Sequence, residues 1–115
     1  MKEQAGWTVE FYVDARGNSP VTAFMDGLPE QEQAKMARAI DLLREFGTLL
    51  GMPHARHIER GLWELRAGAG RIFYFAHTGR RFILLHAYLK QRQVAPRQEV
   101  ATARRRWTEF LEGER

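Results

Sequence analysis

Residues 58–90 read IERGLWELRAGAGRIFYFAHTGRRFILLHAYLK. Three runs rich in β-branched and aromatic residues lie in this stretch, over residues 58–66, 71–77 and 81–89, and such runs are typical of β-strands. Gly61 interrupts the first run, and short glycine-containing turns separate the three. Because short turns join antiparallel neighbours, the stretch predicts a three-stranded antiparallel meander.

The flanking segments carry signals for one further strand and three helices. Residues 7–14 resemble a strand, and residues 48–56, which hold Gly51 and Pro53, are expected to form a loop. The expected helices cover residues 20–26 with Ser19 as the N-cap, residues 29–46 with Gly47 as the stop, and residues 96–111.

This order of elements favours an α+β fold in one domain spanning residues 1–115. We expect an antiparallel sheet made of the N-terminal strand and the meander. Two N-terminal helices and one C-terminal helix would cover a single face of that sheet.

Charge is distributed unevenly along the 115 residues. The net charge is +4, but residues 1–54 carry five Lys/Arg against eight Asp/Glu, and residues 55–115 carry thirteen against six. A basic half indicates either a polyanionic partner such as nucleic acid or a solvated basic surface. The chain has no cysteine, no long apolar stretch and no secretory signal, so we expect a cytoplasmic protein without a membrane segment.

Alternation along the strands predicts one apolar and one chemically active sheet face. Trp63 and Leu65 would share the apolar face with Ile72 and Tyr74. The last strand would add four more apolar side chains to that face, namely Ile83, Leu85, Ala87 and Leu89. Leu62 would lie on the opposite, open face, which would collect the polar and aromatic side chains Glu64, Arg66, Arg71, Phe73, Phe75, His86, Tyr88 and Lys90.

Residues 56–106 resemble a known family. The segments LWELR at 62–66, RIFYF at 71–75, ILLHAYLK at 83–90 and PRQEVATA at 96–103 are similar to the phage-related HigB branch of the RelE toxin superfamily. The motifs occur in the family's order and at its spacing. The chain departs from the pattern where the family has paired lysines followed by Thr-Gln, because residues 90–93 read KQRQ here.

The resemblance implies a type II toxin that cleaves mRNA on the ribosome without metal or cofactor. It also implies a small helix-turn-helix antitoxin as partner, with operator DNA bound indirectly through the toxin–antitoxin complex. Two alternatives stay open. One is a ParE-like toxin that acts on DNA gyrase without nuclease activity, and the other is an RNA- or ribosome-binding module that has lost cleavage.

Metal-free RNA cleavage requires a base for the 2′-hydroxyl, cations for the phosphate and an acid for the leaving oxygen. We expect Arg71 to stabilise the phosphate, Arg66 to position it, and Lys90 to act as base or phosphate clamp. His86 is a candidate acid or base, or a structural histidine.

Other residues are candidates for contact with RNA outside the reacting centre. Arg92 would replace the missing lysine, and Tyr88 and Phe73 would stack on bases. Arg104 and Arg105 would contact ribosomal RNA, or face solvent as part of a basic helix. Glu99 is expected to form a structural pair or to serve the dipole of the last helix.

Overall fold

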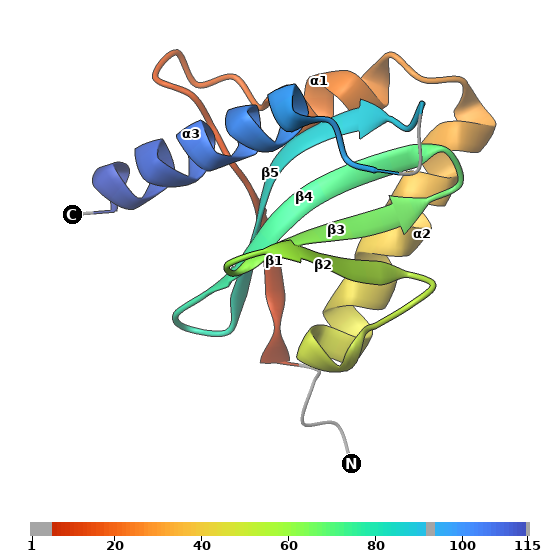
Figure 1. Cartoon of the computed structure of the whole chain (residues 1–115), viewed down its shortest axis with the longest axis horizontal. Helices are drawn as coiled ribbons and strands as arrows, with labels where there is room; N and C mark the ends of the chain where they lie inside the picture. Colours follow the sequence, from red (N-terminus) through yellow and green to blue (C-terminus); the bar gives the residue numbers. More distant parts are fainter. Residues whose placement is uncertain (1–5, 92–93, 115) are drawn as a thin grey trace.

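The structure is a computed structural model that describes residues 6–91 and 94–114 (Figure 1). Its elements follow the chain in this order: β1 Thr8–Phe11, α1 Pro20–Asp26, α2 Glu30–Phe46, a 3-10 helix Gly47–Leu49, β2 Ala55–Glu59, β3 Leu62–Ala67, β4 Gly70–His77, β5 Arg81–Leu89 and α3 Arg97–Gly113. The strands form one mixed sheet in the order β1-β5-β4-β3-β2. The predicted α+β class is therefore confirmed.

The N-terminal helices begin and end where their capping residues predict. Ser19 has extended backbone angles, and its Oγ accepts a hydrogen bond from the backbone N–H of Thr22 at 3.3 Å. Such a bond satisfies one of the free N–H groups at a helix start. α2 ends at Gly47, whose positive φ of 58° suits glycine.

The meander has four strands, so the prediction of a single strand over residues 58–66 is wrong. β2 begins at Ala55, inside the predicted loop, and pairs antiparallel with β3. Gly61 does not interrupt a strand but lies in the turn between two of them, where its φ is +79°. Apolar residues flank this turn on both sides, at Ile58 and Leu62, and periodicity alone did not reveal the reversal of the chain.

β1 lies at one edge of the sheet and runs parallel to β5, with Thr8 opposite Arg81 and Phe11 opposite Leu84. The expectation of an entirely antiparallel sheet is therefore wrong for this strand. β1 reaches its neighbour through the two N-terminal helices and the meander rather than through a hairpin. The sequence therefore contains no hairpin turn that would indicate whether β1 runs parallel or antiparallel to β5.

Helices cover both faces of the sheet, which corrects the prediction of one covered face. α1 and α2 pack on the face that buries Leu65, Ile72 and Tyr74. α3 packs on the other face, over Phe73 and Phe75 among others. Trp107 of α3 stacks on Phe75 with ring centroids 4.2 Å apart. The open face expected from the sequence is thus in large part a second core.

A β-bulge in β5 changes the alternation that the sequence predicts. Phe73 lies opposite His86 while Tyr74 lies opposite Leu84, so Leu85 has no partner across the strand pair. A bulge shifts the following side chains to the other face. Leu85 and Tyr88 consequently belong to the core under α3, whereas Ala87 belongs to the core under α1 and α2.

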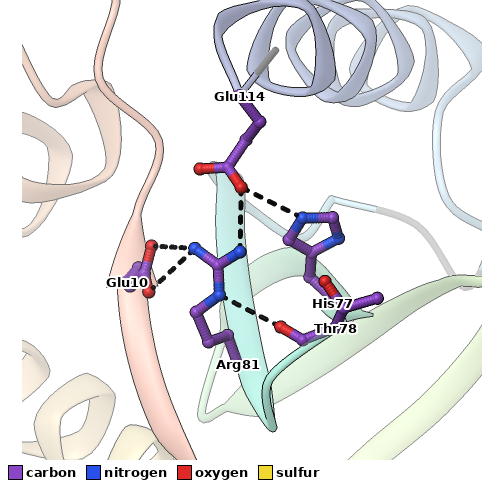
Figure 2. Close-up of polar contacts among 5 residues, drawn as sticks. All are labelled: Glu10, His77, Thr78, Arg81 and Glu114. Atoms are coloured by element: carbon purple, nitrogen blue, oxygen red, sulfur yellow. Dashed lines mark hydrogen bonds and ion pairs between the residues drawn. The ribbon is translucent and has the colours of Figure 1, made fainter.

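Arg81, the first residue of β5, connects three elements at the end of the sheet (Figure 2). Its guanidinium contacts the Glu10 carboxylate of β1 at 3.3 Å and the Glu114 carboxylate after α3 at 2.8 Å. Its Nε donates to the Thr78 carbonyl at 3.1 Å, and Glu114 also contacts His77 at 3.4 Å. These contacts tie the end of α3 to the sheet, and the opposite end of the sheet is left for the candidate site.

Candidate functional site

Three cations singled out in the sequence come together where β3 turns into β4. Arg66 lies directly opposite Arg71, and Arg71 lies opposite Tyr88 of β5. Lys90 follows β5, and its backbone N–H donates to the Ala69 carbonyl in the β3–β4 turn at 2.7 Å. We call Arg66, Arg71 and Lys90 the cationic corner.

The members of the cationic corner differ in exposure. Lys90 is exposed, and Arg66 is half-buried with its Nη1 3.3 Å from the Sδ of Met52. Arg71 is only 4% exposed, and its Nη1 donates to the carbonyls of Gly68 and Gly70, both at 2.8 Å. Burial lowers the pKa of Arg71, and the neighbouring Arg66 lowers it further. The expected direct contact of Arg71 with a phosphate does not fit this position, because β3–β5 enclose the side chain.

A buried carboxylate lies at the centre of the same region. Glu64 is 1% exposed, and its Oε1 is 3.1 Å from Arg56 Nη2 and 3.8 Å from Arg71 Nε. Its Oε2 accepts a hydrogen bond from the Tyr88 hydroxyl at 2.8 Å. Burial and this bond raise the pKa of Tyr88, so its hydroxyl stays a donor. Glu64 therefore offsets the charge of two arginines and fixes Tyr88.

Phe73 and Tyr88 are not available to stack on RNA bases, which corrects the sequence prediction. Phe73 is fully buried and Tyr88 is 7% exposed. Their rings contact each other with centroids 5.4 Å apart under the start of α3. The prediction placed them on the correct face but assumed that no helix covers that face.

His86 forms a chain of polar contacts between β5 and α3. Its Nε2 lies 2.5 Å from Glu99 Oε1, and its Nδ1 lies 2.9 Å from Arg106 Nη1. Because a guanidinium can only donate, Nδ1 accepts and Nε2 carries the proton that is given to Glu99. Burial lowers the pKa of His86, which favours this neutral form. Both ring nitrogens are thus occupied, and the expected structural pair of Glu99 is confirmed.

The three consecutive arginines of α3, at positions 104–106, have different contacts. Arg104 contacts the Glu59 carboxylate at 2.9 Å and lies over the Trp107 ring at 4.8 Å. Arg105 is exposed, and Arg106 donates to the Leu85 carbonyl as well as to His86. Of the two arginines predicted to contact ribosomal RNA, Arg105 is the one that has no carboxylate within ion-pair distance among the described residues. Arg92 lies outside the described residues.

Comparison with known families gives one match and one negative result. Residues 23–108 match the model of the family described as phage-derived Gp49-like protein (DUF891). The chain belongs to this Gp49-like family. The search of curated proteins found no match. The Gp49-like family is associated with toxin–antitoxin systems and is RelE/HigB-like, which implies an antitoxin as partner of this Gp49-like chain.

Two functional features of this Gp49-like protein were missed by reasoning from the sequence. Arg56 lies in the segment that the sequence predicts as a loop, and this prediction gives no sign of its place beside Glu64. Arg106 was grouped with its basic neighbours, although its spacing of three residues from Ala103 places it on the buried side of α3.

The described residues give two further findings. Across residues 6–91 and 94–114, no helix is long and apolar enough to cross a membrane. Within the same ranges, no group of three or more histidine, cysteine or acidic side chains is placed to hold a metal ion.

Proposed function

We propose that this Gp49-like protein is the toxin of a type II toxin–antitoxin pair and cleaves mRNA on the ribosome without a metal ion. The family association and the cationic corner support this proposal. Its partners would be a helix-turn-helix antitoxin, mRNA and the ribosome, all in the cytoplasm. Operator DNA would be reached through the antitoxin.

The observation that carries the proposal is the clustering of positive charge at the β3–β4 turn. Arg66 and Arg71 are cross-strand partners, and the backbone of Lys90 is bonded to the turn itself. Among the described residues, Glu64 is the one buried carboxylate within ion-pair distance of Arg71. Cations held together in this way stabilise the negative charge that develops on a phosphate during cleavage by the 2′-hydroxyl.

We assign different roles to the three cations according to their exposure. Arg66 and Lys90 reach solvent and would contact the phosphate, with Lys90 as base or clamp. Arg71 would act as a positioning residue, because its guanidinium holds the carbonyls of Gly68 and Gly70 and so fixes the turn beside Lys90. His86 would support the site through Glu99 and Arg106, and it would donate a proton to RNA only after releasing Glu99.

The test compares induced wild type with Arg66→Ala, Lys90→Ala and Lys90→Arg, and uses Arg38→Ala on α2 as a matched control. Mapped 5′ ends of transcripts should show cleavage by wild type and by the control. Loss of a phosphate contact should lower cleavage at least tenfold in the two alanine variants. Lys90→Arg keeps the charge but supplies no base, so its activity separates the clamp from the base.

The same experiment decides against the proposal if wild type leaves transcripts intact. Intact transcripts with a DNA-damage response would indicate action on gyrase. Intact transcripts with ribosome-bound protein would indicate a binding module without cleavage. Arg71→Ala with wild-type cleavage and a normal fold would remove Arg71 from the site.

A further inference from the structure

A groove of about 530 Å³ runs between the outer strand β2 and the N-terminal half of α3. Its floor is aliphatic, with Ile58 from β2 and Val100 and Ala101 from α3. Val94, at the near end of the groove, is 77% exposed, which is unusual for a large apolar side chain. The groove thus offers apolar surface that the described residues leave uncovered.

Among the described residues, the rim of the groove carries three arginines and one carboxylate, that of Glu59. Arg56 and Arg104 line it and are each held in place by a carboxylate, those of Glu64 and Glu59. Arg97 at the start of α3 is exposed, and the described residues give its guanidinium no carboxylate within ion-pair distance. The Arg56 side chain is 36% exposed beside its pair with Glu64, so part of it faces the groove. A ligand in the groove is therefore expected to carry acidic groups.

The side chains on the floor of the groove indicate whether it would bind a peptide or RNA. Single-stranded RNA is usually bound by aromatic rings that stack on its bases. Among the described residues that line this groove, valine, isoleucine and alanine supply the apolar surface, and phenylalanine, tyrosine and tryptophan are absent. His57 also lines it, but its ring already packs against Trp63 with centroids 5.3 Å apart. Aliphatic side chains match the aliphatic side chains of a peptide. The groove therefore favours an acidic and aliphatic peptide over a nucleic acid.

The backbone of β2 can also contribute to binding of a peptide, because this strand lies at the edge of the sheet. β2 is the last strand in the sheet order, so a strand pairs with it on one side only. The backbone groups on the outer side of such a strand can pair with an extended segment of another chain. A peptide lying in the groove would run along this edge.

We propose that the groove between β2 and α3 binds an extended segment of the antitoxin in which acidic and aliphatic side chains alternate. The identity of the partner as antitoxin rests on the proposed function. Aliphatic side chains of the segment would fill the floor over Val100 and Ala101, and its carboxylates would contact Arg97 and Arg56. The groove includes neither Arg66 nor Lys90, the two members of the cationic corner that reach solvent, so antitoxin binding and RNA binding are separable.

The test uses two groove variants, Ala101→Phe, which fills the groove, and Arg97→Glu, which reverses the charge at its rim. Both positions are exposed on α3, and Ala37→Phe and Arg38→Glu are matched controls on the exposed side of α2. Calorimetry measures binding of the helix-turn-helix antitoxin of the proposed pair and of an eight-nucleotide oligouridine. We expect each groove variant to weaken antitoxin binding at least tenfold, each control to leave it unchanged, and Ala101→Phe to bind oligouridine like wild type.

Wild-type antitoxin affinity in Ala101→Phe would overturn the proposal. Loss of oligouridine binding in Ala101→Phe with unchanged antitoxin binding would also overturn it and would identify the groove as an RNA path. Cleavage of mRNA is scored separately. If wild type binds antitoxin through the groove but cleaves no mRNA, the nuclease proposal fails and the docking proposal stands.

Discussion

At the scale of single residues, the hydroxyl of Tyr88 illustrates how the site depends on buried polar contacts. The hydroxyl donates to Glu64, a carboxylate that is almost fully buried and also faces Arg56 and Arg71. A buried acceptor that loses its donor retains the cost of desolvation without the compensating bond. Both the Tyr88 hydroxyl and the two arginines therefore compensate the cost of burying the Glu64 carboxylate.

Tyr88→Phe removes this donor while it keeps the ring. We expect the free energy of unfolding to fall by about 1–3 kcal/mol, because Glu64 loses one of its partners. Tyr74→Phe is the matched control, since the structure gives the hydroxyl of Tyr74, at the centre of the other core, no hydrogen-bond partner among the described residues. Urea denaturation measures both. Equal losses in the two variants would contradict the role of Glu64.

His86 is expected to make stability depend on pH. Burial lowers its pKa in the folded protein below the usual 6.5, so near and below pH 6.5 the unfolded state binds the proton more readily. The stability that neutral His86 contributes is therefore present above about pH 6.5 and is lost as the pH falls toward the lowered value.

The measurement compares wild type with His86→Gln, which has no titrating group at this position. Denaturation from about pH 7.5 to about pH 5.5 should show that the stability advantage of wild type over the variant shrinks. The other histidines are common to both proteins and cancel in the difference. An advantage that grows as the pH falls would show that Glu99 dominates and that the folded protein favours protonated His86.

At the scale of elements, the β2–β3 turn is the place where a small residue decides the packing. Gly61 has a φ of +79°, and a Cβ built on it would lie 2.9 Å from Cη2 of Trp107. The Trp107 ring is stacked on Phe75 and has little room to move. Gly61 thus allows the turn of one hairpin to approach α3.

Gly61→Ala tests this approach against a control with the same backbone conformation. Gly17 has a φ of +85° and nothing within 4 Å of its Cβ position, so Gly17→Ala carries only the backbone cost of about 1–2 kcal/mol. We expect Gly61→Ala to lower the free energy of unfolding by more than this, because the methyl group also meets Trp107. Chemical denaturation of both variants gives the comparison, and equal losses would show that Trp107 shifts without cost.

The elements also show what the sequence can and cannot predict. Caps and periodicity predicted α1 and α2 closely, because Ser19 and Gly47 act locally. Alternation placed Glu64, Arg71 and Tyr88 on one face correctly. It did not reveal that α3 covers this face, since the path of a helix depends on packing between distant segments. Exposure of the site was therefore the part that could not be predicted.

At the scale of the whole molecule, the acidic part and the basic part of the chain form different layers of the fold. The acidic residues 1–54 supply α1 and α2 on one face of the sheet, and the basic residues 55–115 supply β2–β5 and α3. Opposite signs on the two layers create a field that attracts a polyanion to one side of the molecule. The half-buried Arg66 and the exposed Lys90 lie on the basic side, and Arg38 on α2 lies on the acidic one.

This asymmetry predicts how salt affects binding of single-stranded RNA. Each phosphate that a cation neutralises contributes about 0.7 to the slope of log K against log salt concentration. Arg66→Ala and Lys90→Ala should each lower the slope by about this amount, whereas Arg38→Ala should leave it unchanged because that cation faces away from the basic layer. Titration of labelled oligouridine at several salt concentrations measures the slopes. If Arg38→Ala lowers the slope as much as Lys90→Ala does, binding follows net charge alone and the cationic corner has no special part in it.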